Sequence, residues 1–345
     1  MKILFDINHP AHVHFFKAPA RILESSGAEI LFTSRDKDVT TQLLSELGMQ
    51  HIQLTSSGTG GIISLAKELV QRDFQLYKIA KSFRPDAMAA IGGTFVAHVG
   101  TVTSTPSVVF YDTENAKLQN LITYPFSSAV VTPECYSGWV PRNKNIRYRG
   151  YHELSYLSDK GFTPCMDIAI ENGINPETKN FIIRVVSWNA NHDIGENGWS
   201  NDLLSKVTQQ LSSRGNVIIS SERKLPAELK KYAYTGKPSS IHHVMAYSDL
   251  YIGESATMAS ECAVMGVYSL YIALTPRGYT TEQEVKYKMV KNIHSLAWPE
   301  IADQIEIALR VPKKQIEKNF KHMMSDTIDV AAFAANTIKN LARTN

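Results

Sequence analysis

Cysteine is scarce in this chain, and its placement excludes a disulfide framework. The 345 residues include three cysteines, Cys135, Cys165 and Cys262, and no two of them form a Cys-x-x-Cys pair. An odd number of widely separated cysteines is typical of thiols in a reducing compartment. We therefore expect a fold held by packing rather than by cross-links.

Long apolar runs are also missing. No run approaches the ~20 residues that a membrane-spanning helix needs, and residues 1–6 lack the uncharged apolar stretch of a secretory signal. The sequence predicts a cytoplasmic protein without transmembrane contact and leaves open a peripheral position at the inner face of the cell membrane. The basic stretch at residues 313–321 is interpreted as the solvated face of a helix, with a membrane-surface role as the alternative.

Charge of neither sign is in excess. Lys and Arg number 36 against 33 Asp and Glu, a formal net charge of +3, which is too small to indicate a nucleic-acid partner. Hydrophobic residues make up 43% and charged residues 20% of the chain, which are ordinary values for a globular protein. At ~150 residues per domain, the length predicts two domains.

What the sequence does contain is a regular alternation of apolar runs and helical patterns. This alternation predicts an α/β fold with parallel sheets, because parallel strands need helical crossovers. The first half contains predicted strands at residues 2–7, 29–33, 51–54, 87–91, 107–111 and 129–132, and the second half at residues 181–186, 216–220, 250–252 and 268–272.

The alternation breaks at residues 158–164, a polar stretch with glycine and proline that suits a linker. We expect Rossmann-like domains at residues 1–165 and 166–325. A final helix within residues 326–345 has no strand after it and is free to pack back on the N-terminal domain. In the first helix, interior Pro19 predicts either a kink or a later start.

The second half carries the most informative loop, at residues 253–261. A buried strand ends at Gly253, and a helix begins near Ser255 or Thr257, so free backbone N–H groups and the helix dipole favour a phosphate there. Glu261 lies about one turn further on, within reach of a polyol such as a ribose. A plain helix cap with a surface glutamate is the alternative. The loop matches neither a Walker motif nor G-x-G-x-x-G.

The first loop gathers Asp6, Asn8, His9, His12 and His14. Three imidazoles so close together raise the possibility of a metal site, but no carboxylate or cysteine pattern completes one, and we predict none. A histidine at the start of the first helix is suited to act as a general base on a sugar hydroxyl. His12 is the predicted base, whereas His14 fits equally well as a packed or surface imidazole.

Three further loops follow strands of the second half. The loop that begins at Ser187 is dense in hydrogen-bonding groups, and Glu282 and Gln283 are suited to hold sugar hydroxyls. The cations after Ser220 could meet phosphate. A solvated loop is the alternative in each case. A loose echo also links residues 90–94 and 251–255, which both run from a strand through glycine to a small polar residue and a helix.

Several motifs resemble a family of predicted bacterial and archaeal glycosyltransferases. The resemblance covers nearly the whole chain. That family in turn resembles the GT-B superfamily, alongside UDP-N-acetylglucosamine 2-epimerase and the peptidoglycan N-acetylglucosaminyltransferase. The resemblance rests on residues 6–17 (DINHPAHVHFFK), 111–114 (YDTE), 148–153 (YRGYHE), 184–188 (RVVSW) and 253–261 (GESATMASE).

The resemblance implies a GT-B fold, with two Rossmann-like domains that face each other across a cleft. The C-terminal domain would hold a nucleotide-sugar donor and the N-terminal domain an acceptor. His12 matches the histidine of a Gly-His-Val loop. By the same resemblance Ser255, Ala256 and Thr257 match the diphosphate-binding turn, Glu261 contacts the ribose, and Glu282 and Gln283 read the donor sugar. We also expect Ser187 and Gly253 to bind the nucleotide or its diphosphate, and Asn8, His9 and His14 to lie on the acceptor side.

The sequence therefore predicts a metal-independent glycosyltransferase that uses a nucleotide-sugar donor, expected to be a UDP-sugar, and no cofactor. Its partner would be a hydroxyl acceptor, with a lipid-linked one left open, in glycan or cell-surface polysaccharide synthesis. One alternative is an epimerase of the UDP-N-acetylglucosamine 2-epimerase type that uses Glu114, His192 or Glu282. Another is a non-catalytic nucleotide-sugar binding protein.

Overall fold

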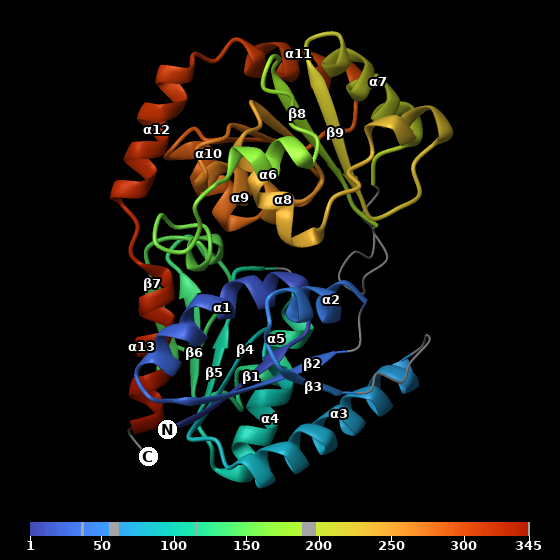
Figure 1. The fold of residues 1–345 in the computed structure, drawn as a ribbon. Coiled ribbons are helices and arrows are strands. Elements are labelled where there is room, and N and C mark those ends of the chain that lie inside the picture. Colours follow the sequence, from blue (N-terminus) through green and yellow to red (C-terminus); the bar gives the residue numbers. More distant parts are fainter. Residues whose placement is uncertain (36–37, 55–61, 115, 188–197, 344–345) are drawn as a thin grey trace. The chain divides into compact units, whose positions relative to one another are not determined.

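The computed structural model describes residues 1–35, 38–54, 62–114, 116–187 and 198–343 (Figure 1). The chain forms two compact units. Unit 1 comprises Met1–Tyr156 and Ile328–Asn345, and unit 2 comprises Leu157–Thr327. Each unit is built on one parallel sheet with helices on its faces, so the predicted α/β class is confirmed.

The sheet of unit 1 has the strand order β3-β2-β1-β4-β5-β6-β7. Its central strands are buried along their length, as their continuous apolar runs predict. The strands are β1 (Lys2–Ile7), β2 (Glu29–Arg35), β3 (His51–Leu54), β4 (Ala87–Ile91), β5 (Ser107–Phe110), β6 (Ala129–Pro133) and β7 (Asn145–Tyr148). The helical elements up to residue 156 are α1 (Pro10–Ser25), α2 (Asp38–Glu46), α3 (Ile62–Phe83), α4 (Thr94–Thr103), α5 (Lys117–Thr123) and the short η1 (His152–Ser155).

Helix α1 begins at Pro10 rather than later, and it continues past Pro19 to Ser25. A proline has no N–H, so the carbonyl of the residue four positions earlier loses its helical donor. Here that carbonyl belongs to Phe15, and the buried hydroxyl of Ser155 donates to it at 2.6 Å. The later start is therefore wrong, because a side chain from η1 satisfies the group that Pro19 leaves unpaired.

The last helix, α13 (Val330–Arg343), belongs to unit 1, where it packs against α1, β4 and η1. Two contacts tie it to the edge of the sheet. The Ile328 N–H donates to the Arg149 carbonyl at 3.1 Å, and the ring of Phe333 lies 5.4 Å from that of Tyr148. Among the described residues, no helix combines the length and apolarity needed to cross a membrane.

The sheet of unit 2 has the order β12-β11-β10-β8-β9. Its strands are β8 (Asn180–Val185), β9 (Asn216–Ser221), β10 (Leu250–Gly253), β11 (Ser269–Ile272) and β12 (Val290–Ile293). Its helical elements are α6 (Met166–Glu171), α7 (Asn201–Ser212), η2 (Ala227–Tyr232), η3 (Pro238–Ser240), α8 (Ile241–Ala246), α9 (Ala256–Val264), α10 (Gly278–Val285), α11 (Trp298–Leu309) and α12 (Lys313–Ser325).

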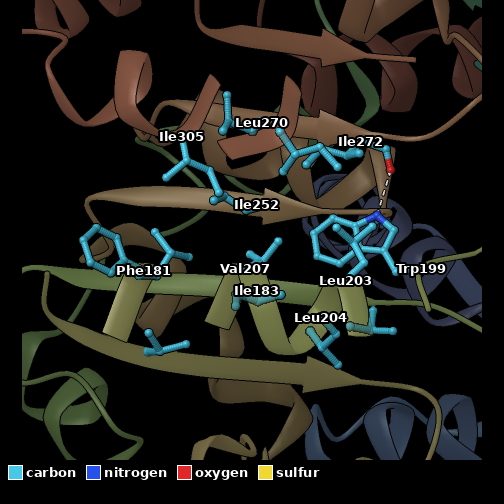
Figure 2. Close-up of a cluster of buried hydrophobic side chains, with 14 of the residues drawn as sticks. Phe181, Ile183, Trp199, Leu203, Leu204, Val207, Ile252, Leu270, Ile272 and Ile305 are labelled. Atoms are coloured by element: carbon cyan, nitrogen blue, oxygen red, sulfur yellow. Dashed lines mark hydrogen bonds between the residues drawn. The ribbon is translucent and has the colours of Figure 1, made fainter. Parts of the chain in front are cut away.

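One face of this sheet packs on α7 and α11 and forms an apolar core (Figure 2). Trp199 lies at its edge and is almost fully buried, and its indole N–H donates to the Ile272 carbonyl at 3.3 Å. A buried indole is stable where its polar nitrogen finds such a partner. The core thus fixes the chain at Trp199, just before α7 and next to the carboxyl ends of the strands.

Candidate functional site

Each sheet has one point where the strand order reverses, between β1 and β4 in unit 1 and between β8 and β10 in unit 2. Ligands of open α/β sheets bind outside the carboxyl ends of the strands at such points. The loops after β1 and β10, which carry most of the predicted site residues, lie at these two positions. The echo between residues 90–94 and 251–255 is explained as well, because β4 and β10 occupy equivalent places beside the first strand of each unit.

In unit 2, Gly253 closes β10 against the neighbouring strand. A Cβ at this position would stand 2.5 Å from the Arg184 carbonyl oxygen and 2.8 Å from the Tyr251 hydroxyl. The close approach brings β8 and β10 together at their carboxyl ends and sets the direction in which the chain enters α9. Glycine is therefore required here by space rather than by its backbone torsion angles.

The start of α9 combines a filled cap with further N–H groups. Ser255 is the N-cap, and its hydroxyl accepts from the Met258 N–H at 3.3 Å. The first N–H groups of an α-helix have no acceptor within the helix, so those of Ala256 and Thr257 are the groups available to an anion. The Ser255 hydroxyl thus caps the helix, while the half-buried Thr257 side chain lies on its first turn.

Glu254 fastens the loop that follows β8 to this point. Its buried carboxylate accepts from the Val186 N–H at 3.1 Å and from the Trp199 N–H at 2.6 Å. These two donors stand on either side of residues 188–197, which lie outside the described residues together with the alternative catalytic residue His192. Ser187 is described, and its N–H donates to the Glu222 carboxylate at 3.0 Å.

Glu261 lies on the second turn of α9 and is buried rather than exposed. One carboxylate oxygen lies 2.9 Å from Nε2 of His242, which is buried as well. The ring of Phe162 stands 6.0 Å from the His242 ring and covers this pair. The alternative of a surface glutamate is therefore wrong, and Glu261 is held beneath the start of α9 by an imidazole from α8.

Glu282 and Gln283 point in different directions on α10. Gln283 is fully buried, and its amide donates to the Ser260 hydroxyl at 2.8 Å, which joins α10 to α9. Glu282 is half-buried on the same helix. Gln283 therefore packs against α9 inside unit 2, and Glu282 is the more accessible of the two residues.

In unit 1, the first loop leads into α1, and a histidine caps the start of that helix. His9 is the N-cap of α1, with its Nδ1 accepting from the Ala11 N–H at 3.2 Å. Nδ1 of His12 accepts from the Asn8 N–H at 3.3 Å. In this arrangement the neutral His12 ring carries its proton on Nε2, so it accepts a further proton only when the bond to Asn8 is given up. His14 lies apart, stacked on Tyr156 at 5.2 Å.

Asn8 is anchored by a buried ionic group beneath the loop. Its amide donates to the Asp6 carboxylate at 3.0 Å, and its carbonyl oxygen accepts from Nη2 of Arg72 at 2.5 Å. Arg72 also lies 3.6 Å from Asp6 and 4.1 Å from the centre of the Phe95 ring. Burial lowers the pKa of Arg72, while the carboxylate of Asp6 opposes this shift. The loop after β1 is therefore rigidly supported from α3.

Sequence reasoning missed one pair at the same edge of the sheet. Asp112 follows β5, and its carboxylate lies 3.0 Å from Nδ1 of His152 in η1. Burial raises the pKa of Asp112, but the charge of His152 and hydrogen bonds from His152 and Thr113, with a smaller contribution from His12, bring it down to about 2. Nε2 of His152 is buried without a hydrogen-bond partner among the described residues. Both residues lie in motifs that carried the family resemblance, and the position of Asp112 after a buried strand was the available signal.

Metal binding finds no support in the described part of the chain. No group of three or more His, Cys, Asp or Glu side chains there is arranged to hold an ion. His9 and His12 have ring centroids 5.9 Å apart, and one ring nitrogen of each accepts a backbone N–H within the loop. His9 thus caps the start of the helix, and His12 holds the backbone of the loop at Asn8.

A family model described as "Protein of unknown function (DUF354)" matches residues 1–335, and the chain belongs to this family. An uncharacterized protein from Methanocaldococcus jannaschii is 21% identical over 286 residues, which span 77% of this chain and 80% of that protein. The structure resembles UDP-GlcNAc 2-epimerase from Neisseria meningitidis bound to UDP-GlcNAc (TM-score 0.67, 15% identity, 100% of both chains). It also resembles MurG from Acinetobacter baumannii (TM-score 0.63, 14% identity, 99% of this chain and 100% of that chain). These likenesses confirm the expected two-domain α/β fold of the GT-B class.

Proposed function

We propose that this member of the DUF354 family is a glycosyltransferase that moves a sugar from a nucleoside-diphosphate sugar to a hydroxyl acceptor. The observation that carries the proposal is the start of α9, where the N–H groups of Ala256 and Thr257 follow a capped turn at the strand-order reversal of unit 2. A helix start in this position is suited to a diphosphate. The similar structures include one bound to UDP-GlcNAc, which supports a UDP-sugar as the donor.

Donor binding is assigned to unit 2. The diphosphate would take the N–H groups of Ala256 and Thr257 and the hydroxyl of Thr257, and Glu261, held by His242, would contact the ribose. Glu282 would face the sugar. Gln283 would act by positioning, because its amide is engaged with Ser260 inside the unit.

Acceptor activation is assigned to unit 1, with His12 as the base. A bond forms between the acceptor oxygen and the anomeric carbon, the acceptor proton moves to His12, and the bond from that carbon to the diphosphate breaks with its electron pair on the leaving oxygen. The helix start of α9 would stabilise that charge without a metal. Asp112 would favour the protonated imidazole of His12, since the two interact electrostatically.

Two matched cap variants test donor binding. Ser255 and Ser200 both cap helices of unit 2, α9 and α7 respectively, through side chains that accept from a backbone N–H. A thermal-shift screen against UDP-, GDP-, CMP- and dTDP-sugars should show stabilisation of the native protein by one donor class. The Ser255→Ala variant should lose part of that ligand-induced shift, because the turn that presents the Ala256 and Thr257 N–H groups is no longer held by its cap, and Ser200→Ala should keep it. Equal ligand-induced shifts in the two variants would contradict the assignment of donor binding to the start of α9.

The base is tested by His12→Ala with His14→Ala as the control. His14 lies in the same helix turn region but is stacked on Tyr156. With the donor identified by the screen and an acceptor found by product analysis, His12→Ala should lower the transfer rate by about 10²- to 10⁴-fold, the usual contribution of a general base. Transfer at a near wild-type rate in His12→Ala would show that another group takes the proton.

A nucleotide-sugar epimerase is the second candidate, because UDP-GlcNAc 2-epimerase structures share the fold with this chain. Such an enzyme would need acid and base groups on the sugar ring, with Glu114 and Glu282 the described candidates. Incubation with UDP-N-acetylglucosamine alone in heavy water separates the two activities. Deuterium at C2 would favour the epimerase, whereas an unlabelled donor would count against it. Donor binding without any product in a broad acceptor screen would favour a non-catalytic binding protein.

A further inference from the structure

Unit 1 carries large apolar side chains on its surface that its core does not use. We call them the apolar patch: Phe74, Leu118, Leu121, Ile122, Phe126 and Trp139. Each is exposed, with Leu118 at 76%, Trp139 at 69% and Leu121 at 65%. Single exposed apolar residues are ordinary, whereas a contiguous group marks an interaction surface.

Helix α5 shows that this exposure is built into the sequence. Its Asn120 and Thr123 are buried, while Leu118, Leu121 and Ile122 on the same short helix are exposed. The buried Asn120 amide donates to the Tyr136 hydroxyl at 3.3 Å. The helix therefore buries two polar side chains and leaves its three large apolar side chains exposed, which is the reverse of their usual placement in a surface helix of a globular protein.

His98 on α4 joins the elements that carry the patch. Its Nδ1 lies 2.9 Å from the carboxylate of Asp73 on α3, next to Phe74, and its Nε2 lies 2.8 Å from the Ile122 carbonyl of α5. The His98 ring also contacts the Phe126 ring edge-on at 5.1 Å. Helices α3, α4 and α5 lie side by side in unit 1 (Figure 1). His98 thus joins the parts of α3, α4 and the α5 region that carry Phe74, Ile122 and Phe126.

Positive charge accompanies the patch. Nζ of Lys78 lies 4.4 Å from the centre of the Phe74 ring, and exposed Lys117 stands directly before Leu118. Trp139 is followed by exposed Arg142. Leucine and phenylalanine with an interfacial tryptophan and flanking cations form the composition that binds an anionic bilayer surface. A second copy of the chain would bring the same cations together, which disfavours self-association.

We propose that the apolar patch docks unit 1 on a bilayer surface that carries anionic phospholipids. The patch adjoins the carboxyl ends of β4 and β5, because Gln119 of α5 donates to the Gly92 carbonyl at 3.2 Å and the Tyr111 hydroxyl donates to the same oxygen at 2.5 Å. Docking would therefore hold the acceptor side of unit 1 near the membrane and favour a lipid-linked hydroxyl as acceptor. That last consequence rests on the proposed function, whereas docking itself does not.

Co-sedimentation with vesicles tests the docking, without any sugar donor. The full chain should sediment with phosphatidylcholine vesicles that contain about a third phosphatidylglycerol, and much less with phosphatidylcholine alone. The Leu118→Ser/Leu121→Ser double variant should bind at least about tenfold more weakly, since each leucine loses apolar burial. The matched control is Val285→Ser/Ile307→Ser, which removes exposed apolar side chains from unit 2 and should bind as the wild type does.

A charge series distinguishes this surface from the basic helix α12. The Lys78→Gln/Lys117→Gln variant should lose about tenfold or more in binding, since each cation near an anionic surface contributes roughly fivefold. Lys313→Gln/Lys314→Gln should not. The fluorescence emission of Trp139 should also shift to the blue when vesicles are added, and the Trp139→Phe variant should lack that shift. This measurement on the wild type does not depend on a variant that could destabilise the fold.

Three results would overturn the proposal: no binding to anionic vesicles by the wild type, binding that depends on α12 instead, or concentration-dependent dimers that the leucine variant abolishes. Because all assays omit the donor, they remain informative if the glycosyltransferase assignment fails. Conversely, if the protein binds a donor but does not bind vesicles, the proposed function stands and only the docking proposal is refuted.

Discussion

Replacement of Asp112 by asparagine is expected to lower the free energy of unfolding of unit 1. Asparagine keeps the shape of the side chain and can still accept the hydrogen bond from Nδ1 of His152, so the change removes little besides the charge. The pKa of Asp112 falls from 3.8 to about 2 in the folded chain despite its burial. Such a fall corresponds to about 2 kcal/mol of stability at a pH where the carboxyl is ionised in both states.

The dependence of this effect on pH follows from the sign of the pKa change. A carboxyl whose pKa is lower in the folded than in the unfolded chain stabilises the fold above its unfolded pKa, here 3.8. The stabilisation then disappears as the pH falls through the folded value of about 2. The deficit of Asp112→Asn should accordingly shrink from about 2 kcal/mol at pH 5 to about 1 kcal/mol at pH 3.

Urea unfolding at the two pH values measures this deficit. Because two units need not unfold together, hydrogen exchange at the amides of β5 should serve as the probe, since it reports on unit 1. The control is Asp86→Asn, an exposed carboxylate of the same unit that accepts from the Lys2 N–H at 2.7 Å. A deficit that is the same at pH 5 and pH 3, or no larger than that of the control, would refute the reasoning.

Three further outcomes are expected. Gly253→Ala should lower the free energy of unfolding of unit 2 by about 1–3 kcal/mol, because a Cβ would meet the Arg184 carbonyl oxygen at 2.5 Å, and calorimetry would measure the loss. Ser255→Ala should cost about 0.5–2 kcal/mol through the lost cap, measured by urea unfolding in the absence of donor. The hydrogen bond to Asp73 raises the pKa of His98 against the opposing effect of burial. The protonated imidazole therefore stabilises unit 1 fully below the ordinary pKa of 6.5, and this stabilisation is lost as the pH rises through the pKa of His98 in the folded chain. His98→Ala should therefore destabilise unit 1 more at pH 6 than at pH 9; the same deficit at both would contradict it.

The sequence predicted every interior strand of the two sheets and two of their four edge strands, β3 and β9. Runs such as residues 87–91 and 181–186 are apolar without interruption because helices cover both faces, and the structure confirms them as β4 and β8 with small differences at their ends. The edge strands β7 and β12 were missed. Each is four residues long and carries a cation, Arg147 or Lys291, which interrupts the apolar run on which strand prediction depends.

The candidate site divides in the same way. The turn from β10 into α9 is a local feature, since a strand, a glycine and a capping serine follow one another in the sequence and fold where they stand. The pair of Asp112 and His152 is not local, because 40 positions separate residues 112 and 152. Likewise spacing alone leaves open whether Glu261 faces a ligand or the solvent, and only the packing of α8 against α9 brings His242 to it.

The sequence by itself determined the α/β class, the interior strands and the helix start that suits a diphosphate, because each depends on the order of neighbouring residues. Tertiary structure alone decided which groups surround those loops. It supplied the Ser155 hydroxyl that permits Pro19 within α1, and the imidazole that holds Asp112 ionised. It also turned the apolar side of α5 outward. These are contacts between segments far apart in the chain, and no local pattern encodes which distant side chain will meet a given backbone group.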